Sequence, residues 1–380
     1  MKKLCLVFTV VLSTMLLTAC GNLSQQDVVD KLAGNLDDSS SYLTTGKMEI
    51  ESDGQMYQYF VEVAFQQPNF YRVTMKNETT NNEQIILKND EGVFVLTPSL
   101  NKQFKFQSDW PLSSSQVYLY QSVLGDILND EGVLFTPGED AYIFETVANY
   151  HGNRDLSKQV ITFDKKTLAP LTVQVLDSEN TVRMTMDFDD FQFNYEFGEG
   201  HFDSDLAMEQ TQNTMGDGTL SEVDLLAAEL YPSYIPDGTS LTDKTPIETE
   251  NGNRVIMTFS GEQAFTIIQE NASVRESLTP EFVSGEIVLI NGAVGALSDH
   301  SLTWIDNGVE FFLVSETLEP EELLSVANSI GSVVDKGSLP ETETETDIEI
   351  DDDTEIDDDI EIDDDIEIDT DSETDTIIVE

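Results

Sequence analysis

The feature that most constrains the fold is a period-two alternation of apolar and polar residues from about residue 55 to residue 194. Its first run puts Tyr57, Tyr59, Val61, Val63 and Phe65 on one face of a strand. We expect further strands, separated by turn residues, at 70–76, 84–88, 93–96, 103–106, 142–146, 159–163, 171–176 and 181–188. This series predicts a long antiparallel meander in a mainly β chain with covering helices, an α+β class.

Two amphipathic helices are expected to cover this meander. Ser24 can cap the first, whose apolar face is Val28, Val29, Leu32 and Leu36. The second is predicted at 115–128, and its apolar side consists of Val117, Tyr120, Val123, Leu124, Ile127 and Leu128.

A polar, glycine-containing segment at 211–220 predicts a linker between two domains, 24–210 and 221–335. In the second, small α+β domain, we expect a short helix at 221–230 and a closing helix from Pro320, with Leu323, Leu324, Ala327 and Ile330 as its buried stripe. Strands are predicted at 254–259, 265–269, 285–290, 301–305 and 309–315. Asn307-Gly308 is a strong hairpin signal because both residues accept positive φ angles.

The first 19 residues are typical of a signal peptide. Lys2 and Lys3 precede an apolar run at 4–17, too short to span a bilayer comfortably, which ends at Cys20. This end resembles a bacterial lipobox, so we expect diacylglycerol on Cys20, a lipidated N-terminus at 20–23 and an anchor on the outer face of the cytoplasmic membrane. The alternatives are an ordinary signal peptide with a chance cysteine, or a membrane anchor that is retained.

The charge is strongly acidic and excludes one class of partner. Among 380 residues, 74 Asp and Glu face 18 Lys and Arg, a net charge of −56, so we expect no unaided binding to nucleic acid. Four six-residue repeats close to Ile-Glu-Ile-Asp-Asp-Asp fill 348–371. Their like charge predicts a disordered acidic tail at 336–380, either a plain spacer or a segment that meets cations or basic partners.

The sequence contains no recognisable arrangement of residues for covalent chemistry. The second cysteine, Cys5, lies in the expected signal peptide, so a mature chain has no disulfide or thiolate metal site. His151, His201 and His300 are scattered, and adjacent residues such as Asp299, His300 and Ser301 cannot converge on a strand. We therefore expect no catalytic residues, no metal and no cofactor beyond the lipid on Cys20; the protein is predicted not to be an enzyme.

Aromatic residues exceed what one sheet face under two helices requires. They either fill a closed core or line a cavity. The candidate cavity residues are Tyr57, Tyr59, Val61, Phe65, Tyr71, Phe94, Phe104, Phe106, Tyr120, Leu124 and Phe163.

Three segments, 67–73, 97–103 and 160–171, resemble the lipoprotein-carrier (LolA/LolB-like) superfamily. Residues 110–111 with 118–127 are similar to Gram-positive lipoproteins of that fold, called outer-membrane-lipoprotein-sorting-like, including a sporulation-associated group. Residues 221–331 resemble a small domain of unknown function, DUF4367-like.

The resemblance implies an antiparallel half-barrel closed by helices over an apolar cavity. It implies a membrane-anchored extracytoplasmic protein that binds a lipid, an acylated protein such as a lipoprotein, or another amphiphile without catalysis. A tether at Cys20 argues against a shuttle between membranes. The alternative is an envelope sensor or assembly factor that binds a protein partner and no small ligand, which a filled, dry half-barrel would favour.

Overall fold

The computed structural model describes residues 23–332, except 53, 109, 112–114, 151–154, 216–228, 250–251, 276 and 278. The predictions for the signal peptide, Cys20, His151 and the acidic tail fall outside these residues, as does most of the helix expected at 221–230. The described residues belong to one compact unit.

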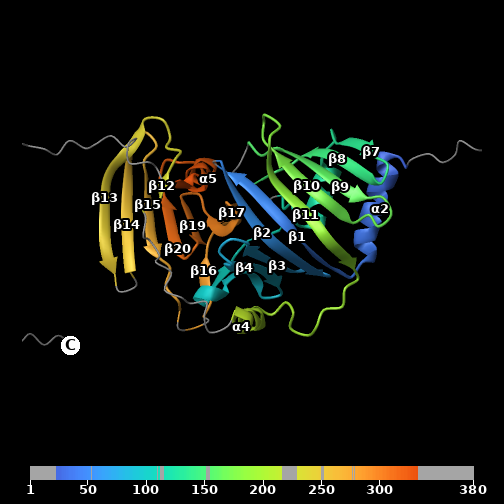
Figure 1. The fold of residues 1–380 in the computed structure, drawn as a ribbon, viewed down its shortest axis with the longest axis horizontal. Helices are drawn as coiled ribbons and strands as arrows, with labels where there is room; N and C mark the ends of the chain where they lie inside the picture. The colour runs from blue at the N-terminus through green and yellow to red at the C-terminus, as the bar shows by residue number, and fades with distance from the viewer. Residues whose placement is uncertain are drawn as a thin grey trace, which may run out of the picture. The chain divides into compact units, whose positions relative to one another are not determined.

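A twelve-stranded sheet forms the larger part of this unit (Figure 1). Its order is β16-β6-β5-β4-β3-β2-β1-β11-β10-β9-β8-β7, and the β16–β6 pair is parallel while the other neighbours are antiparallel. The strands are β1 (Ser41–Ser52), β2 (Gln55–Gln66), β3 (Phe70–Asn77), β4 (Glu83–Asn89), β5 (Gly92–Thr97), β6 (Lys102–Phe106), β7 (Leu134–Pro137), β8 (Ala141–Val147), β9 (Lys158–Asp164), β10 (Pro170–Leu176), β11 (Val182–Phe193) and β16 (Glu281–Val283). This confirms the predicted class, a mainly β open sheet with covering helices.

Helices cover both faces of the larger sheet. Its main core lies under α2 (Gln25–Asp38) and α3 (Tyr120–Asn129), and a smaller cluster on the opposite face packs against α4 (Ser204–Met215). A short 3₁₀ helix, η1 (Pro98–Leu100), joins β5 to β6. Within the described residues, no helix has the length and apolar character needed to cross a membrane.

The structure confirms the predicted start of the first covering helix but not that of the second. Ser24 caps α2 through a capping box with Asp27, as expected. The predicted start of the second helix at residue 115 is wrong, because α3 begins at Tyr120. The amide of Gln116 instead donates to Ser122 Oγ at 2.7 Å, which holds the preceding residues outside the helix.

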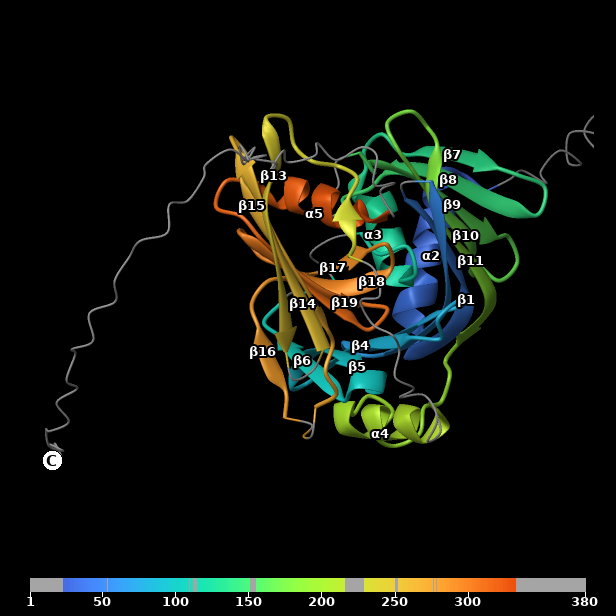
Figure 2. The ribbon, with the colours of Figure 1, turned by 60° about the vertical axis from the view of Figure 1, so that its left-hand side comes forward.

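A seven-stranded sheet follows (Figure 2), in the order β13-β14-β15-β20-β19-β18-β17. Its strands are β13 (Thr239–Thr249), β14 (Gly252–Gly261), β15 (Phe265–Asn271), β17 (Glu286–Ile290), β18 (Ala293–Leu297), β19 (Ser301–Asp306) and β20 (Val309–Val314). One face packs under α5 (Pro320–Asn328), and β12 (Tyr231–Pro232) pairs with β21 (Ile330–Ser332). Asn307 and Gly308 have φ angles of 48° and 75°, which confirms the hairpin signal.

Two boundaries differ from the sequence interpretation. Ile330 lies in β21 and not in the closing helix. Residues 211–215, expected in a linker, belong to α4, which is held to the larger sheet by the buried side chains of Ala207 and Met208.

The two larger sheets are joined by a shared core and by a buried ion pair. Ile287, Val294 and Ala296 of the second sheet belong to the main core of the first. Lys102 of β6 pairs with Glu310 of β20, and their side chains are 4% and 14% exposed. Because both charges are removed from water, each depends on the other.

Breaking this ion pair on one side should destabilise the protein. Lys102→Met leaves Glu310 buried without a cation, and we expect the free energy of unfolding in urea to fall by about 3 kcal/mol. Combining it with Glu310→Leu should restore most of the loss. Lys47→Met, which removes an exposed lysine paired with Glu49 and Glu78, is the control and should change little. Equal losses for the two lysine variants would contradict the buried pair.

Candidate functional site

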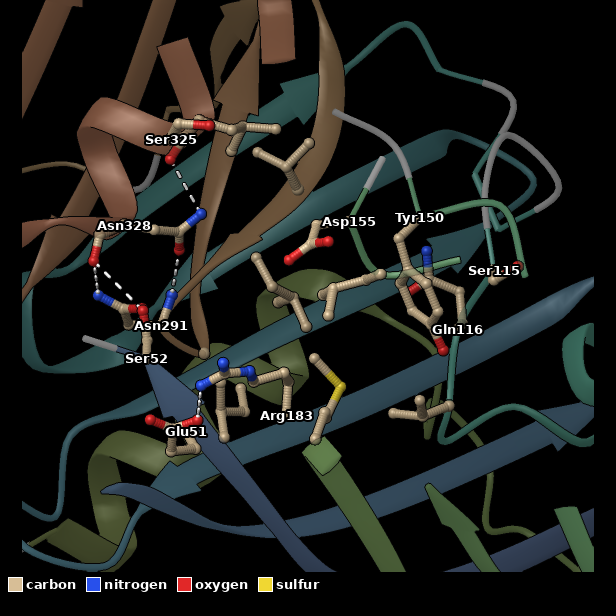
Figure 3. Close-up of a pocket in the computed structure, with 18 of the residues that line it drawn as sticks. Glu51, Ser52, Ser115, Gln116, Tyr150, Asp155, Arg183, Asn291, Ser325 and Asn328 are labelled. Atoms are coloured by element: carbon tan, nitrogen blue, oxygen red, sulfur yellow. Dashed lines mark hydrogen bonds and ion pairs between the residues drawn. The ribbon is translucent and has the colours of Figure 1, made fainter. Parts of the chain in front are cut away.

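A cavity of about 540 Å³ lies between the two larger sheets (Figure 3). One wall comes from β1 and β11, another from β17 and α5, and the remainder from the residues just before α3 and around Tyr150. This volume is within the range of about 300–1,000 Å³ that holds small molecules in proteins.

The inner wall of the cavity is apolar. Its lining side chains come from five separate parts of the chain and are almost fully buried: Ile50, Val117, Tyr118, Met184, Ile287 and Leu324. Apolar surface of this kind stabilises a bound alkyl group by removing it from water.

A partly buried carboxylate positions the part of the wall that precedes α3. Asp126 accepts hydrogen bonds from Ser115 Oγ at 3.0 Å and from Gln159 Nε2 at 2.6 Å. Tyr150 in turn donates from its hydroxyl to Gln159 Oε1 at 3.4 Å. Burial raises the pKa of Asp126, and the two hydrogen bonds partly offset that effect. The network fixes the start of the 115–119 segment and the Tyr150 ring.

The rim of the cavity is charged. Arg183 donates from Nε to Asp177 Oδ2 at 2.7 Å and from Nη1 to Glu51. These hydrogen bonds, with Asp177 first, raise the pKa of Arg183. The backbone amide of Thr181 and then Arg183 lower the pKa of Asp177. Arg183, which lines the cavity, is therefore already bound to two carboxylates.

The wall opposite the larger sheet is built on a tight turn. Asn291 and Gly292 have φ angles of 50° and 90°, which places both in the left-handed region. Asn291 is fixed to α5, because its amide donates to Asn328 Oδ1 at 3.1 Å and its Nδ2 donates to the Asn328 carbonyl at 2.9 Å. The Tyr59 hydroxyl donates to the Asn291 carbonyl at 2.8 Å. This turn thus connects the second sheet, α5 and β2.

The eleven residues predicted to line a cavity lie elsewhere. Eight belong to the main core: Tyr59, Val61, Phe65, Tyr71, Phe106, Tyr120, Leu124 and Phe163. Tyr57 and Phe104 are partly buried against it, and Phe94 packs on the opposite face near α4. None of the eleven is among the residues that line the 540 Å³ cavity.

The rings in the main core pack against one another. Tyr42 and Phe65 have centroids 5.3 Å apart, and Tyr120 meets Phe163 edge to face at 6.1 Å. Trp110, fully buried, meets the Tyr71 ring edge to face at 5.7 Å. These geometries are those that aromatic pairs prefer in protein cores.

The sequence contained a signal for one wall of the cavity. Asn291-Gly292 directly follows an apolar run and is the same dipeptide type as the Asn307-Gly308 hairpin. Met184 and Arg183 carry no such signal, because they line the cavity only through the pairing of β11 with β1.

No metal centre is present in the described ranges: no group of three or more His, Cys, Asp or Glu residues there could hold an ion. His201 stacks on Phe197 at 4.5 Å, and burial together with Arg72 lowers its pKa to about 4. His300 accepts a hydrogen bond through its carbonyl from the amide of Ser315.

The fold and the cavity define a class: a mainly β protein with covering helices and a small-molecule-sized cavity between two sheets. Residues 1–202 match the family described as sporulation protein YdcC-like. Sporulation protein YdcC of Bacillus subtilis (strain 168) is 41% identical over 329 residues, which is 87% of this chain and 97% of that relative. The chain belongs to the YdcC-like sporulation protein family.

Solved structures show more distant likeness. The MucA/MucB complex of Pseudomonas aeruginosa includes a chain 14% identical, with a TM-score of 0.30 over 80% of this chain and 98% of that one. A LolA superfamily protein of Nitrosomonas europaea, NE2245, is 12% identical, with a TM-score of 0.28 over 49% of this chain and 100% of its own.

The wall at Gly292 gives a test of how the cavity is built. A Cβ at this position would lie 2.1 Å from the Tyr59 ring, at a φ angle that side chains avoid. We expect Gly292→Ala to lower the free energy of unfolding by about 2 kcal/mol or more. Gly34→Ala, inside α2 where a Cβ meets nothing within 4 Å, is the control and should raise it by up to about 1 kcal/mol. Urea unfolding measures both; a neutral Gly292→Ala would contradict the close approach.

Proposed function

We propose that this protein is a lipid-anchored extracytoplasmic protein that binds one small amphiphile in the cavity between its sheets, without covalent chemistry. The observation that carries the proposal is the cavity itself, with an apolar inner wall and a charged rim. An alkyl tail would lie against the inner wall, where each buried methylene contributes about 0.8 kcal/mol. The polar head would then meet the rim residues.

The position of the first described residues supports the anchor. Leu23 packs against the main core and lies three residues after Cys20. A lipid on Cys20 would hold the folded body within roughly 10 Å of the anchor, since each residue spans at most about 3.3–3.6 Å. We place the protein on the outer face of the cytoplasmic membrane, and its membership of a sporulation protein family supports a role in sporulation.

The anchor is tested by metabolic labelling of the full chain with an alkyne-bearing fatty acid in a Gram-positive host. We expect the native protein to carry the label and to be found in the membrane fraction. Cys20→Ala should carry no label and should leave the membrane fraction. Cys5→Ala, which changes the other cysteine, should keep the label. Membrane association of an unlabelled native chain would contradict lipidation.

The cavity is tested by native mass spectrometry and organic extraction of the chain after Cys20, residues 21–380. We expect one bound amphiphile per protein. Leu289→Trp places a large ring on a partly buried lining position and should abolish it. Val147→Trp, at a site 62% exposed and outside the lining, is the matched control and should retain the ligand. Thermal unfolding confirms that both variants fold.

A second candidate is an envelope sensor or assembly factor that binds a protein partner and no small ligand. The packed aromatic rings on the face under α2 and α3 favour it, because they fill the space that a carrier-type cavity would need. Phe282, 73% exposed on the edge strand β16, is a candidate contact for such a partner. An empty, folded native protein that also rejects added alkyl amphiphiles would direct the search to this class.

A further inference from the structure

We propose that the amphiphile in the cavity carries an uncharged hydrogen-bond donor, a hydroxyl or an amide N–H, which it donates to Oδ1 of Asn291. This inference rests on the proposed function and specifies the head of its ligand. It follows from the hydrogen bonds that Asn291 makes and from the one that it lacks.

Asn291 lines the cavity and is 8% exposed. Its backbone amide donates to Asn328 Oδ1 at 3.1 Å, its Nδ2 donates to the Asn328 carbonyl at 2.9 Å, and its carbonyl accepts from Tyr59. Its remaining polar atom, Oδ1, is closed to water and receives no hydrogen bond from the described part of the chain. Asn291 therefore keeps one buried acceptor without a donor.

The contact with Asn328 determines which atom of the Asn291 amide is left over. If the side-chain oxygen and nitrogen were exchanged, the oxygen would lie 2.9 Å from the Asn328 carbonyl, and two acceptors would face each other. Nδ2 also lies 3.5 Å from the Tyr57 hydroxyl. The leftover atom is therefore the oxygen, which accepts a hydrogen bond and cannot donate one.

The neighbours of Asn291 direct their donors elsewhere. Figure 3 shows Ser52 and Asn328 beside it at one end of the cavity. Ser52 Oγ donates to the Asn328 carbonyl at 3.4 Å, and Asn328 Nδ2 donates to the Leu324 carbonyl at 2.9 Å. The side-chain donor groups of these three lining residues are thus all directed at protein acceptors, so a head that binds here has to supply the donor itself.

The burial of Asn291 selects an uncharged donor. An ammonium head would lose most of its water beside a side chain that is 8% exposed, and one neutral amide oxygen does not offset that cost. A carboxylate head at pH 7 has no hydrogen to donate. A hydroxyl or an amide N–H donates without bringing a charge into the wall.

The empty protein cannot satisfy Oδ1 with solvent, because the atom is closed to water. A head reaches it when a neighbouring side chain moves, and Ser52 is suited to this movement because its hydrogen bond to Asn328 is long. Ile287 and Leu324, both almost fully buried, line the same cavity and can receive the alkyl tail. The head thus makes a hydrogen bond that neither protein nor water makes in its absence, which we expect to add about tenfold in affinity.

Three short amphiphiles separate the donor from the tail. Octan-1-ol and 1-methoxyheptane are isomers of equal size, of which only the alcohol donates a hydrogen bond, and octanamide donates through its N–H groups. Each is titrated at pH 7 by calorimetry into residues 21–380, below its solubility limit. We expect one site per protein and about tenfold tighter binding of a donor than of the ether; the tighter of the two donors identifies the head as hydroxyl or amide.

Two matched variants locate the effect at Asn291. Asn291→Gly removes the side chain at a φ angle of 50°, which glycine accepts, and leaves the backbone bonds to Asn328 and Tyr59 possible. It should bind the three probes with nearly equal affinity. Asn307→Gly changes the same kind of Asn-Gly turn, with a φ angle of 48°, at an exposed site outside the lining, and should keep the preference for donors. Thermal unfolding confirms that both variants fold.

The outcomes distinguish this inference from the proposed function. Failure of all three probes to bind the native protein overturns amphiphile binding itself. Saturable binding in which the ether equals both donors leaves the cavity standing and overturns the donor head, and this comparison needs no variant. A preference for donors that survives in Asn291→Gly also overturns it, because a merely structural role of Asn291 would weaken the three probes alike.

Discussion

The structure depends on the seam between its two larger sheets. At this seam the Tyr59 hydroxyl reaches the Asn291 carbonyl, and the missing side chain of Gly292 leaves room for the Tyr59 ring. Lys102 and Glu310 add a buried ion pair between β6 and β20. Since the cavity takes its walls from both sheets, these contacts set its shape as well as the stability of the unit. A ligand there would contact both sheets at once, so its affinity and the rigidity of the seam are linked.

Much of the larger sheet follows from local pattern, because strands with one buried face alternate strictly. β2 shows this alternation and was predicted, whereas β1 was not, since Thr44, Thr45, Gly46 and Lys47 interrupt its apolar series and a bulge follows Thr45. α4 was missed for a similar reason. Its buried residues, Ser204, Ala207, Met208 and Thr211, do follow a helical period, but two of them are polar, so the apolar pattern of the sequence does not show it.

The cavity could not be predicted from the sequence because its lining residues, from Ile50 to Asn328, converge only in the folded chain. The surplus of aromatic residues was open to two interpretations, and the rings of Tyr120 and Phe163 pack in the core instead of lining this cavity. The charged part of the rim was not predicted either, because Arg183 of β11 meets Glu51 of β1 only through the pairing of these two strands.

The most direct test of the central claim is to locate a ligand in the folded protein. A crystal structure of residues 21–380 grown with 10-bromodecan-1-ol, with data collected at the bromine absorption edge, locates the end of the alkyl tail directly. The account predicts one anomalous peak between Met184 and Leu289. A peak among the core rings around Phe163, or a well-ordered protein with no peak, would contradict it.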